Sequence, residues 1–280
     1  MTETFPTPDG TIAYTDTGSG PPVVFLHGNP TSAFLYRHLI AALAPSHRCI
    51  APDYLGFGRS DKPASLPPDF SYLPSDHAVH IEALLQHLDL EDVTLVLHDW
   101  GGPIGLHYAL RHPDRIRRLV LFNTWGWPHD RDLWIGSFSR LAGGPIGRIA
   151  IERFNAFARL VVPLAFADRS RLTSEALHAY ADPLDTPARR HPSWVFPRAL
   201  LSETAWLRGL WADRRTLSSI PALLCWGTRD PAFGAERYLR RWTAVFADCT
   251  VHRLPVGHYV PEEMGADLVP LVRSWMDGTG

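Results

Sequence analysis

A carboxylate between a short apolar run and a pair of glycines is the feature of this sequence best suited to chemistry. Residues 95–102 read Leu-Val-Leu-His-Asp-Trp-Gly-Gly, which places Asp99 directly after the run. The pattern predicts a buried strand, a sharp turn, and a helix beginning at Gly101 or Gly102, because glycine turns tightly without a Cβ clash. A carboxylate at this turn is ionised at neutral pH. It can attack an sp³ carbon directly and leave an ester on the protein.

Two further residues could complete a catalytic set with Asp99. Asp230 lies just beyond the apolar run 222–226, and His258 lies in a loop after the run 249–254. Nucleophile, acid and histidine in this chain order are typical of α/β hydrolases, and an acid beside a histidine is what a base and its orienting group require. Alone, Asp230 could be a turn residue and His258 one of 14 ordinary histidines. Their order along the chain favours the catalytic interpretation.

A turn after an early strand offers hydrogen-bond donors to the same site. Residues 25–31 read Phe-Leu-His-Gly-Asn-Pro-Thr, so Asn29 supplies a side-chain amide, and Trp100 supplies an indole N–H next to Asp99. Two neutral donors there would stabilise an anionic leaving group. Elsewhere Asn29 would be a turn residue and Trp100 a packing aromatic. The predicted turn at Asp99 favours the donor role.

The elements that position these residues follow from the apolar runs. Such runs predict strands at 11–15, 22–26, 48–51, 93–97, 119–122, 222–226 and 249–254. Several are continuously apolar, as in strands buried on both faces of a parallel sheet. A helical stripe follows Ser75, which we expect to be its N-cap, and another helix should span 102–111 and stop before Pro113. The alternation predicts an α/β sheet.

The alternation breaks between about residues 126 and 216, where the sequence is helical, aromatic and rich in proline. We predict a helical cap domain at 126–216, inserted into a core domain of residues 1–125 and 217–280, over the C-terminal edge of the sheet. Some aromatic residues within this segment, or at its start, should line an access tunnel. The candidates are Trp125, Trp127, Trp134, Phe138, Phe154, Phe157, Phe166 and Trp194.

Composition narrows the function further. The 280-residue chain is 45% hydrophobic with a formal net charge of −2 and scattered basic residues, which argues against nucleic-acid or anionic-membrane partners. Cys49, Cys225 and Cys249 lack metal-ligand spacing and a CxxC pair, so we expect buried, inert thiols in a reducing compartment. No metal-ligand cluster is visible. The first residues lack the pattern of a signal peptide, so we expect a cytoplasmic protein.

Four motifs resemble those of haloalkane dehalogenases. They are Val-Phe-Leu-His-Gly-Asn-Pro-Thr-Ser (24–32), Asp-Tyr-Leu-Gly-Phe-Gly-Arg-Ser-Asp-Lys-Pro (53–63), His-Asp-Trp-Gly-Gly (98–102) and Gly-His-Tyr-Val-Pro-Glu-Glu (257–263). The resemblance covers nearly the whole chain, including cap residues 180–183 and 196–198. It implies an α/β-hydrolase fold: a mostly parallel eight-stranded sheet flanked by helices, with an inserted helical cap.

The resemblance also implies a chemistry. Asp99 would displace halide from a small apolar halogenated substrate and form a covalent alkyl ester. Asn29 and Trp100 would bind the halide, and their backbone N–H groups would hold the later oxyanion. Water activated by His258, which Asp230 orients, would hydrolyse the ester to an alcohol. No metal or organic cofactor is needed.

Members of the family differ in the position of the acid. Some carry Glu after the sixth strand, where this sequence has Asn123, so the acid here should be Asp230, after the seventh. Its halide donors look like Asn29 with Trp100, unlike members that pair two tryptophans. The combination resembles the subgroup with an Asp-His-Asp triad and an Asn-Trp pair.

Other functions remain open at this stage. An epoxide hydrolase shares the Asp nucleophile but typically uses two cap tyrosines as acids, and this cap contains only Tyr180. A fluoroacetate-type dehalogenase would want a basic residue where Trp100 follows Asp99. A serine esterase lacks its serine. A non-catalytic α/β-hydrolase-like ligand-binding protein is the alternative of a different class. The preferred substrate and the oligomeric state are not predicted.

Overall fold

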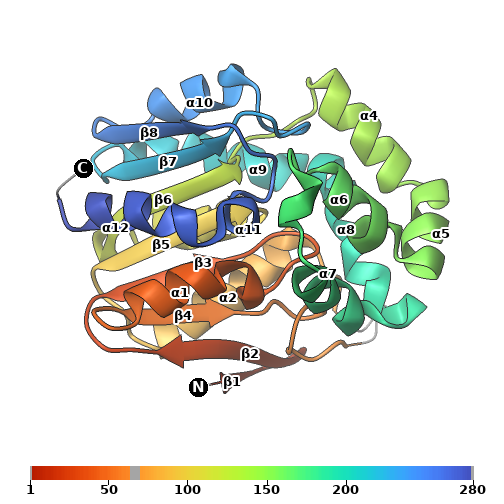
Figure 1. The fold of residues 1–280 in the computed structure, drawn as a ribbon, viewed down its shortest axis with the longest axis horizontal. Helices are drawn as coiled ribbons and strands as arrows, with labels where there is room; N and C mark the ends of the chain where they lie inside the picture. The colour runs from red at the N-terminus through yellow and green to blue at the C-terminus, as the bar shows by residue number, and fades with distance from the viewer. Residues whose placement is uncertain (1, 64–69, 279–280) are drawn as a thin grey trace.

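The computed structural model describes residues 2–63 and 70–278 and contains one eight-stranded sheet, in the order β1-β2-β4-β3-β5-β6-β7-β8 (Figure 1). The strands are β1 (Thr2–Thr7), β2 (Gly10–Thr17), β3 (Pro22–Leu26), β4 (Arg48–Pro52), β5 (Val93–Asp99), β6 (Ile116–Thr124), β7 (Ala222–Gly227) and β8 (Cys249–Leu254). Strand β2 pairs antiparallel with β1 and β4, and the remaining pairs are parallel. The predicted mostly parallel, eight-stranded sheet is confirmed.

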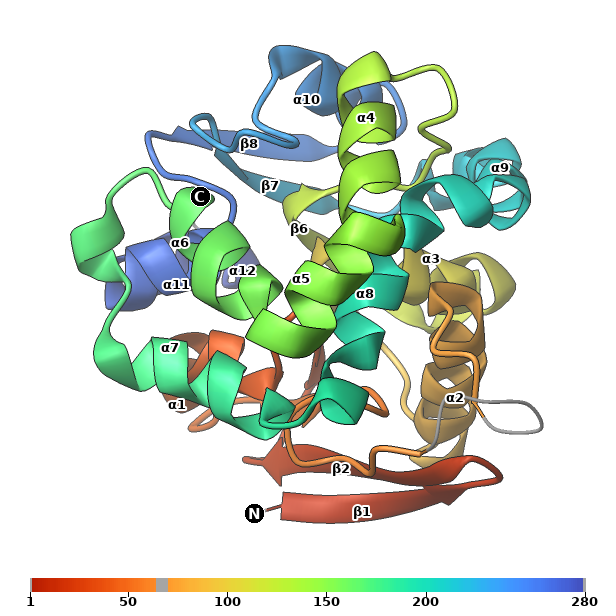
Figure 2. The same cartoon turned by 90° about the vertical axis from the view of Figure 1, so that its right-hand side faces the viewer.

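Helices cover both faces of the sheet (Figure 2). One face carries α1 (Arg37–Leu43), α11 (Val260–Met264) and α12 (Val269–Met276), and the other carries α2 (Pro74–His87), α3 (Gly101–Arg111) and α10 (Glu236–Thr243). Alternate residues of β3 supply the two cores: Val23 and Phe25 pack on the first face, and Val24 and Leu26 on the second. Burial on both faces explains why these strands are continuously apolar.

The segment between β6 and β7 contains helices and loops but no strand. Its α-helices are α4 (Leu133–Ala142), α5 (Pro145–Phe154), α6 (Val162–Leu164), α7 (Ser174–Ala181), α8 (Pro187–Ser202) and α9 (Thr204–Ala212). Most of them gather at the edge of the sheet where β5 and β6 end (Figures 1 and 2). We call residues 126–216 the cap, and its standing as a separate domain remains a prediction. No helix in the described ranges is long and apolar enough to cross a membrane.

Two details differ from expectation. The predicted N-cap Ser75 is wrong: α2 begins at Pro74, and Leu73 occupies the cap position without a side-chain hydrogen bond. Proline suits the first helical position because its missing N–H would lack a helical partner there anyway. Of the three free thiols, Cys49 and Cys225 are buried as expected, whereas Cys249 is only half-buried.

The turn after β5 depends on a close approach between α3 and β3. Asp99 ends β5 with a φ of +52°, a conformation that is uncommon for residues other than glycine. Helix α3 then begins at Gly101, where a Cβ would lie 2.0 Å from the backbone oxygen of Leu26. Backbone atoms cannot move aside as a flexible side chain can, so only glycine fits at this position.

Two glycine substitutions should therefore change stability in opposite directions. Gly101→Ala should lower the free energy of unfolding by about 1–3 kcal/mol or more through overpacking. Gly209→Ala, in α9, is the matched control, because a Cβ there has nothing within 4 Å. It should raise stability by about 0.5–1 kcal/mol, since alanine favours a helix interior. Urea unfolding measures both, and equal stabilities would contradict the close packing at Gly101.

Candidate active site

Asp99 lies at the carboxyl end of β5, held by contacts from neighbouring strands and turns. The Thr124 hydroxyl donates to the Asp99 backbone oxygen at 2.6 Å, and the Asn29 backbone N–H donates to Asp99 Oδ1 at 2.9 Å. The second contact requires Gly28, because a Cβ there would lie 2.2 Å from Asp99 Oδ1. The turn at 28–29 thus supplies an N–H to one oxygen of the buried carboxylate.

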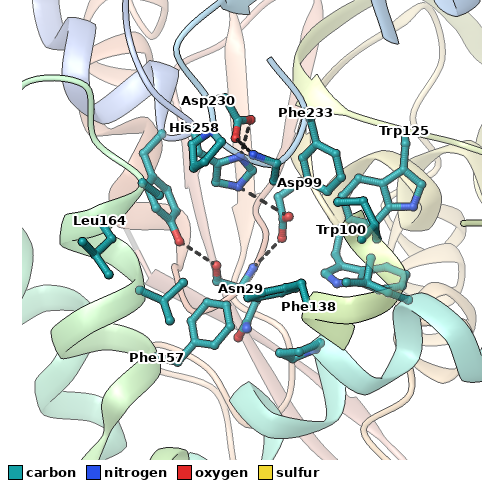
Figure 3. Close-up of a pocket in the computed structure, with 18 of the residues that line it drawn as sticks. Asn29, Asp99, Trp100, Trp125, Phe138, Phe157, Leu164, Asp230, Phe233 and His258 are labelled. Carbon is teal, nitrogen blue, oxygen red and sulfur yellow. Dashed lines mark hydrogen bonds and ion pairs between the residues drawn. The ribbon is translucent and has the colours of Figure 1, made fainter. Parts of the chain in front are cut away.

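His258 lies between two carboxylates (Figure 3). Its Nδ1 lies 2.8 Å from Asp230 Oδ2, and its Nε2 lies 3.5 Å from Asp99 Oδ2. All three side chains are buried. Asp99 ends β5, Asp230 follows β7, and His258 follows β8, so parallel strands bring them to the same edge of the sheet. The structure therefore brings together the three residues singled out from the sequence.

Asn123 is a further polar member of this group. Its Nδ2 donates to Asp230 Oδ2 at 2.7 Å and to the Gly227 oxygen at 2.9 Å, while its Oδ1 accepts the Gly227 N–H at 2.7 Å. Sequence reasoning treated Asn123 only as the absence of a Glu and missed this contact. Its place at the end of β6, next to β7 in the sheet, is the signal that could have found it.

These contacts shift the pKa values of all three groups. Burial alone would lower the pKa of His258, but Asp230 and then Asp99 raise it to about 10. Burial alone would raise the pKa values of both carboxyl groups, but pairing with His258 lowers them below their usual range. These shifts favour a protonated His258 between two ionised carboxylates.

Asn29 and Trp100 lie beside the carboxylate of Asp99 (Figure 3). The Asn29 side chain donates from Nδ2 to the backbone oxygen of Ser193 in α8 at 3.2 Å. The Tyr259 hydroxyl donates to the Asn29 backbone oxygen at 3.1 Å. Both predicted donors therefore reach the site, with Asn29 held by the cap and by the loop that carries His258.

These groups open into a cavity of about 320 Å³ between the sheet edge and the cap. Its walls are mostly aromatic and aliphatic: Asn29, Asp99, Trp100, Trp125, Trp134, Ile135, Phe138, Phe157, Val161, Leu164, Ala165, Pro197, Leu200, Asp230, Pro231, Ala232, Phe233, His258 and Tyr259. Four of the eight expected aromatics are among them, Trp125, Trp134, Phe138 and Phe157. Phe233 and Tyr259 line the cavity from outside the cap and were not expected.

The loop of His258 is bonded directly to the cap. The His258 N–H donates to the Ala165 oxygen at 2.8 Å. Glu263 accepts backbone N–H groups from Gly257 at 2.8 Å and from Asp168 at 2.9 Å. Glu263 lies in the quoted Gly-His-Tyr-Val-Pro-Glu-Glu motif, but the sequence does not reveal that it bridges to the cap.

The described residues include no group of three or more His, Cys, Asp or Glu side chains that could hold a metal ion. The chemistry available here is that of a buried carboxylate, a histidine paired with a second carboxylate, and neutral N–H donors.

Comparison with known proteins places this geometry in a family. A model of the alpha/beta hydrolase fold family matches residues 21–263. Haloalkane dehalogenase 2 of Mycobacterium tuberculosis is 38% identical over 256 residues, covering 91% of this chain and 87% of that protein. A cis-3-alkyl-4-alkyloxetan-2-one decarboxylase of Shewanella oneidensis is 32% identical over 287 residues, covering 96% and 86%.

A solved structure of a haloalkane dehalogenase has the same fold. The crystal structure of the haloalkane dehalogenase DbeA from Bradyrhizobium elkani superposes with a TM-score of 0.87 at 29% identity, covering 100% of this chain and 98% of that one. The chain belongs to the alpha/beta hydrolase fold family, and its relatives there include haloalkane dehalogenases and an oxetan-2-one decarboxylase.

Proposed function

We propose that this protein is a haloalkane dehalogenase, which converts a small halogenated alkane and water into an alcohol, halide and a proton. One observation carries the proposal: the ionised carboxylate of Asp99 faces an apolar cavity with His258 directly beside it. A nucleophile that is not surrounded by water is more reactive, and an apolar cavity suits an uncharged haloalkane. The family relationship to haloalkane dehalogenases supports the same reaction.

In the first step Asp99 attacks the halogen-bearing carbon. Its Oδ1 already accepts the Asn29 N–H, which leaves Oδ2 as the attacking oxygen. The new C–O bond forms as the carbon–halogen bond breaks, and the halide leaves with the electron pair. The side-chain amide of Asn29 and the indole N–H of Trp100 stabilise its charge as it develops.

In the second step His258, which releases its proton to solvent once Asp99 is esterified, removes a proton from water, and the water oxygen attacks the carbonyl carbon of the Asp99 ester. The negative charge then develops on Oδ1, where the Asn29 backbone N–H already lies, assisted by that of Trp100. His258 gives the proton to the departing alkoxide oxygen, the alcohol leaves, and the carboxyl group of Asp99 loses its own proton to restore the carboxylate. Asp230, held by Asn123, keeps the imidazole in position.

Esterification also prepares the base. Asp99 is one of the two carboxylates that raise the pKa of His258, and an ester carries no charge. The first step therefore lowers the pKa of His258 when a neutral imidazole is needed. The alkylated protein is thus better suited to act as a base than the free protein.

Two alternatives are weaker. The one cap tyrosine, Tyr180, donates its hydroxyl to Glu262 and does not line the cavity, so it does not supply the acid that an epoxide hydrolase needs. Oxetan-2-one decarboxylation is the second candidate, favoured by the Shewanella relative. It would use the same nucleophile on a strained lactone carrying two alkyl groups, whereas a cavity of about 320 Å³ suits a small substrate better.

Replacing the base should trap the intermediate. Wild type should release bromide from 1-bromobutane continuously, whereas His258→Phe should release one equivalent at most and gain the mass of a butyl group on Asp99. The readouts are a bromide assay and peptide mass spectrometry. His178→Phe, at an exposed cap histidine, is the matched control and should behave as wild type.

Absence of both release and adduct in wild type would overturn the proposed function for this substrate. Release of CO₂ from a cis-3-alkyl-4-alkyloxetan-2-one by the same sample would then identify the decarboxylase function.

The change in basicity can be measured without substrate. Asp99→Asn removes the charge as the ester would, so the pKa of His258 should fall below the wild-type value of about 10. NMR titration of the imidazole signals measures it, with Asp248→Asn, at an exposed carboxylate, as the control. Protonation of His258 stabilises wild type fully below about pH 6.5, and this contribution is lost as the pH rises through about 10. An unchanged His258 pKa in Asp99→Asn would contradict the coupling.

A further inference from the structure

Helix α8 of the cap contains two prolines in its interior, Pro192 and Pro197. In an α-helix each backbone oxygen accepts the N–H of the residue four positions later. Proline has no N–H. The residue four positions before Pro197 is Ser193, so the backbone oxygen of Ser193 lacks its usual helical partner.

The side chain of Asn29 binds that oxygen. Asn29 Nδ2 donates to the Ser193 oxygen at 3.2 Å, although the two residues are 164 positions apart in the chain. Both residues are buried, with Ser193 fully enclosed. Pro197 lines the same cavity as Asn29 and Trp100, so the gap in the helical hydrogen bonds lies at the site itself.

This contact selects one orientation of the Asn29 side chain. A carboxamide has a donor end and an acceptor end, which exchange when the group rotates by half a turn. With the amide reversed, Oδ1 would face the Ser193 oxygen, and two acceptors repel. Asn29 Oδ1 has no hydrogen-bond partner among the described residues, so no other protein contact there selects the orientation.

The backbone of Asn29 is fixed independently. Its N–H donates to Asp99 Oδ1, and its oxygen accepts the Tyr259 hydroxyl. Rotation of the side chain is therefore the freedom that remains. Nδ2 carries two hydrogens. With one on Ser193, the second stays available to an anion in the cavity.

We propose that Pro197 is a positioning residue for the leaving group. Because it supplies no N–H, it frees the Ser193 oxygen to hold the Asn29 amide with its donor end toward the site. An ordinary residue at 197 would offer an N–H to Ser193 and compete with Asn29. This inference rests on the proposed function, in which Asn29 stabilises halide.

Two substitutions test it, Pro197→Ala and Pro197→Val. Both restore the N–H, and valine keeps a side chain close to proline in size. Both should fold, because alanine and valine favour a helix interior over proline. Each should raise the bromide Kd by about three- to tenfold, as expected for a weakened hydrogen bond to a charged group. Tryptophan fluorescence titration with sodium bromide measures this.

The control is Pro192→Ala, which makes the same change five residues earlier in α8 and restores a partner to Ala188 instead. Its bromide Kd should stay within about twofold of wild type, since the hydrogen bond of Asn29 is untouched. Catalysis gives a second readout. In the Pro197 variants, kcat/KM should fall more for 1-chlorobutane than for 1-bromobutane, because chloride needs more stabilisation as it leaves.

Each result decides the matter. A wild-type Kd in both Pro197 variants, an effect in alanine but not valine, or an equal effect in Pro192→Ala would overturn the inference while leaving the proposed function intact. If wild type neither binds bromide nor releases it from 1-bromobutane, the proposed function fails and this inference fails with it.

A measurement on the unmodified protein covers the case in which the variants do not fold. The two Nδ2 protons of Asn29 should give separate NMR signals, and bromide should shift mainly one of them. Equal shifts, or none, in a protein that binds bromide would contradict the orientation.

Discussion

The site depends on one constraint, which is that the negative charge of Asp99 is buried beside apolar side chains. Burying an unpaired carboxylate is costly, yet Asp99 must stay ionised to react. The N–H of Asn29 and the protonated His258 offset that cost, and the turn at Gly28 lets the backbone come close enough to contribute. The two carboxylates also pair with His258 at unequal distances. His258 lies closer to Asp230 than to Asp99, which leaves the nucleophile less strongly paired.

Much of the fold was predictable because its central strands are buried on both faces. Apolar runs, several of them continuous, marked seven of the eight strands, whereas β1 (Thr2–Thr7) is largely exposed and has no such run. The turn at Asp99 was equally predictable, because its glycines indicate that the start of α3 approaches the backbone of β3 closely. Within the site, the chain order of Asp99, Asp230 and His258 was enough to single them out as a candidate catalytic set. Asn123 could not be assigned, because its contact depends on which strands are neighbours.

The cap was least predictable for a physical reason. Its helices pack through contacts between residues distant in sequence, so helical periodicity does not say which aromatics face the cavity. Trp134 and Phe138 of α4 do, whereas Phe154, at the end of α5, is largely exposed. The bond between Ser193 and Asn29 is of the same kind. A proline in a helix is visible in the sequence, but the partner of the freed oxygen is not.

Several hydrogen bonds join the cap to the segments that carry the reacting groups, and three of them end next to those groups or on them. Ala165 accepts from His258, Ser193 accepts from Asn29, and the Trp134 indole donates to the oxygen of Pro231, next to Asp230. If the whole cap swung away as a rigid lid, all three bonds would break and the site would be disassembled at each turnover. Substrate entry and product exit are therefore better served by local movements of wall side chains. A truncated protein that lacked the cap would therefore lose the alignment of its reacting groups as well as their protection from water.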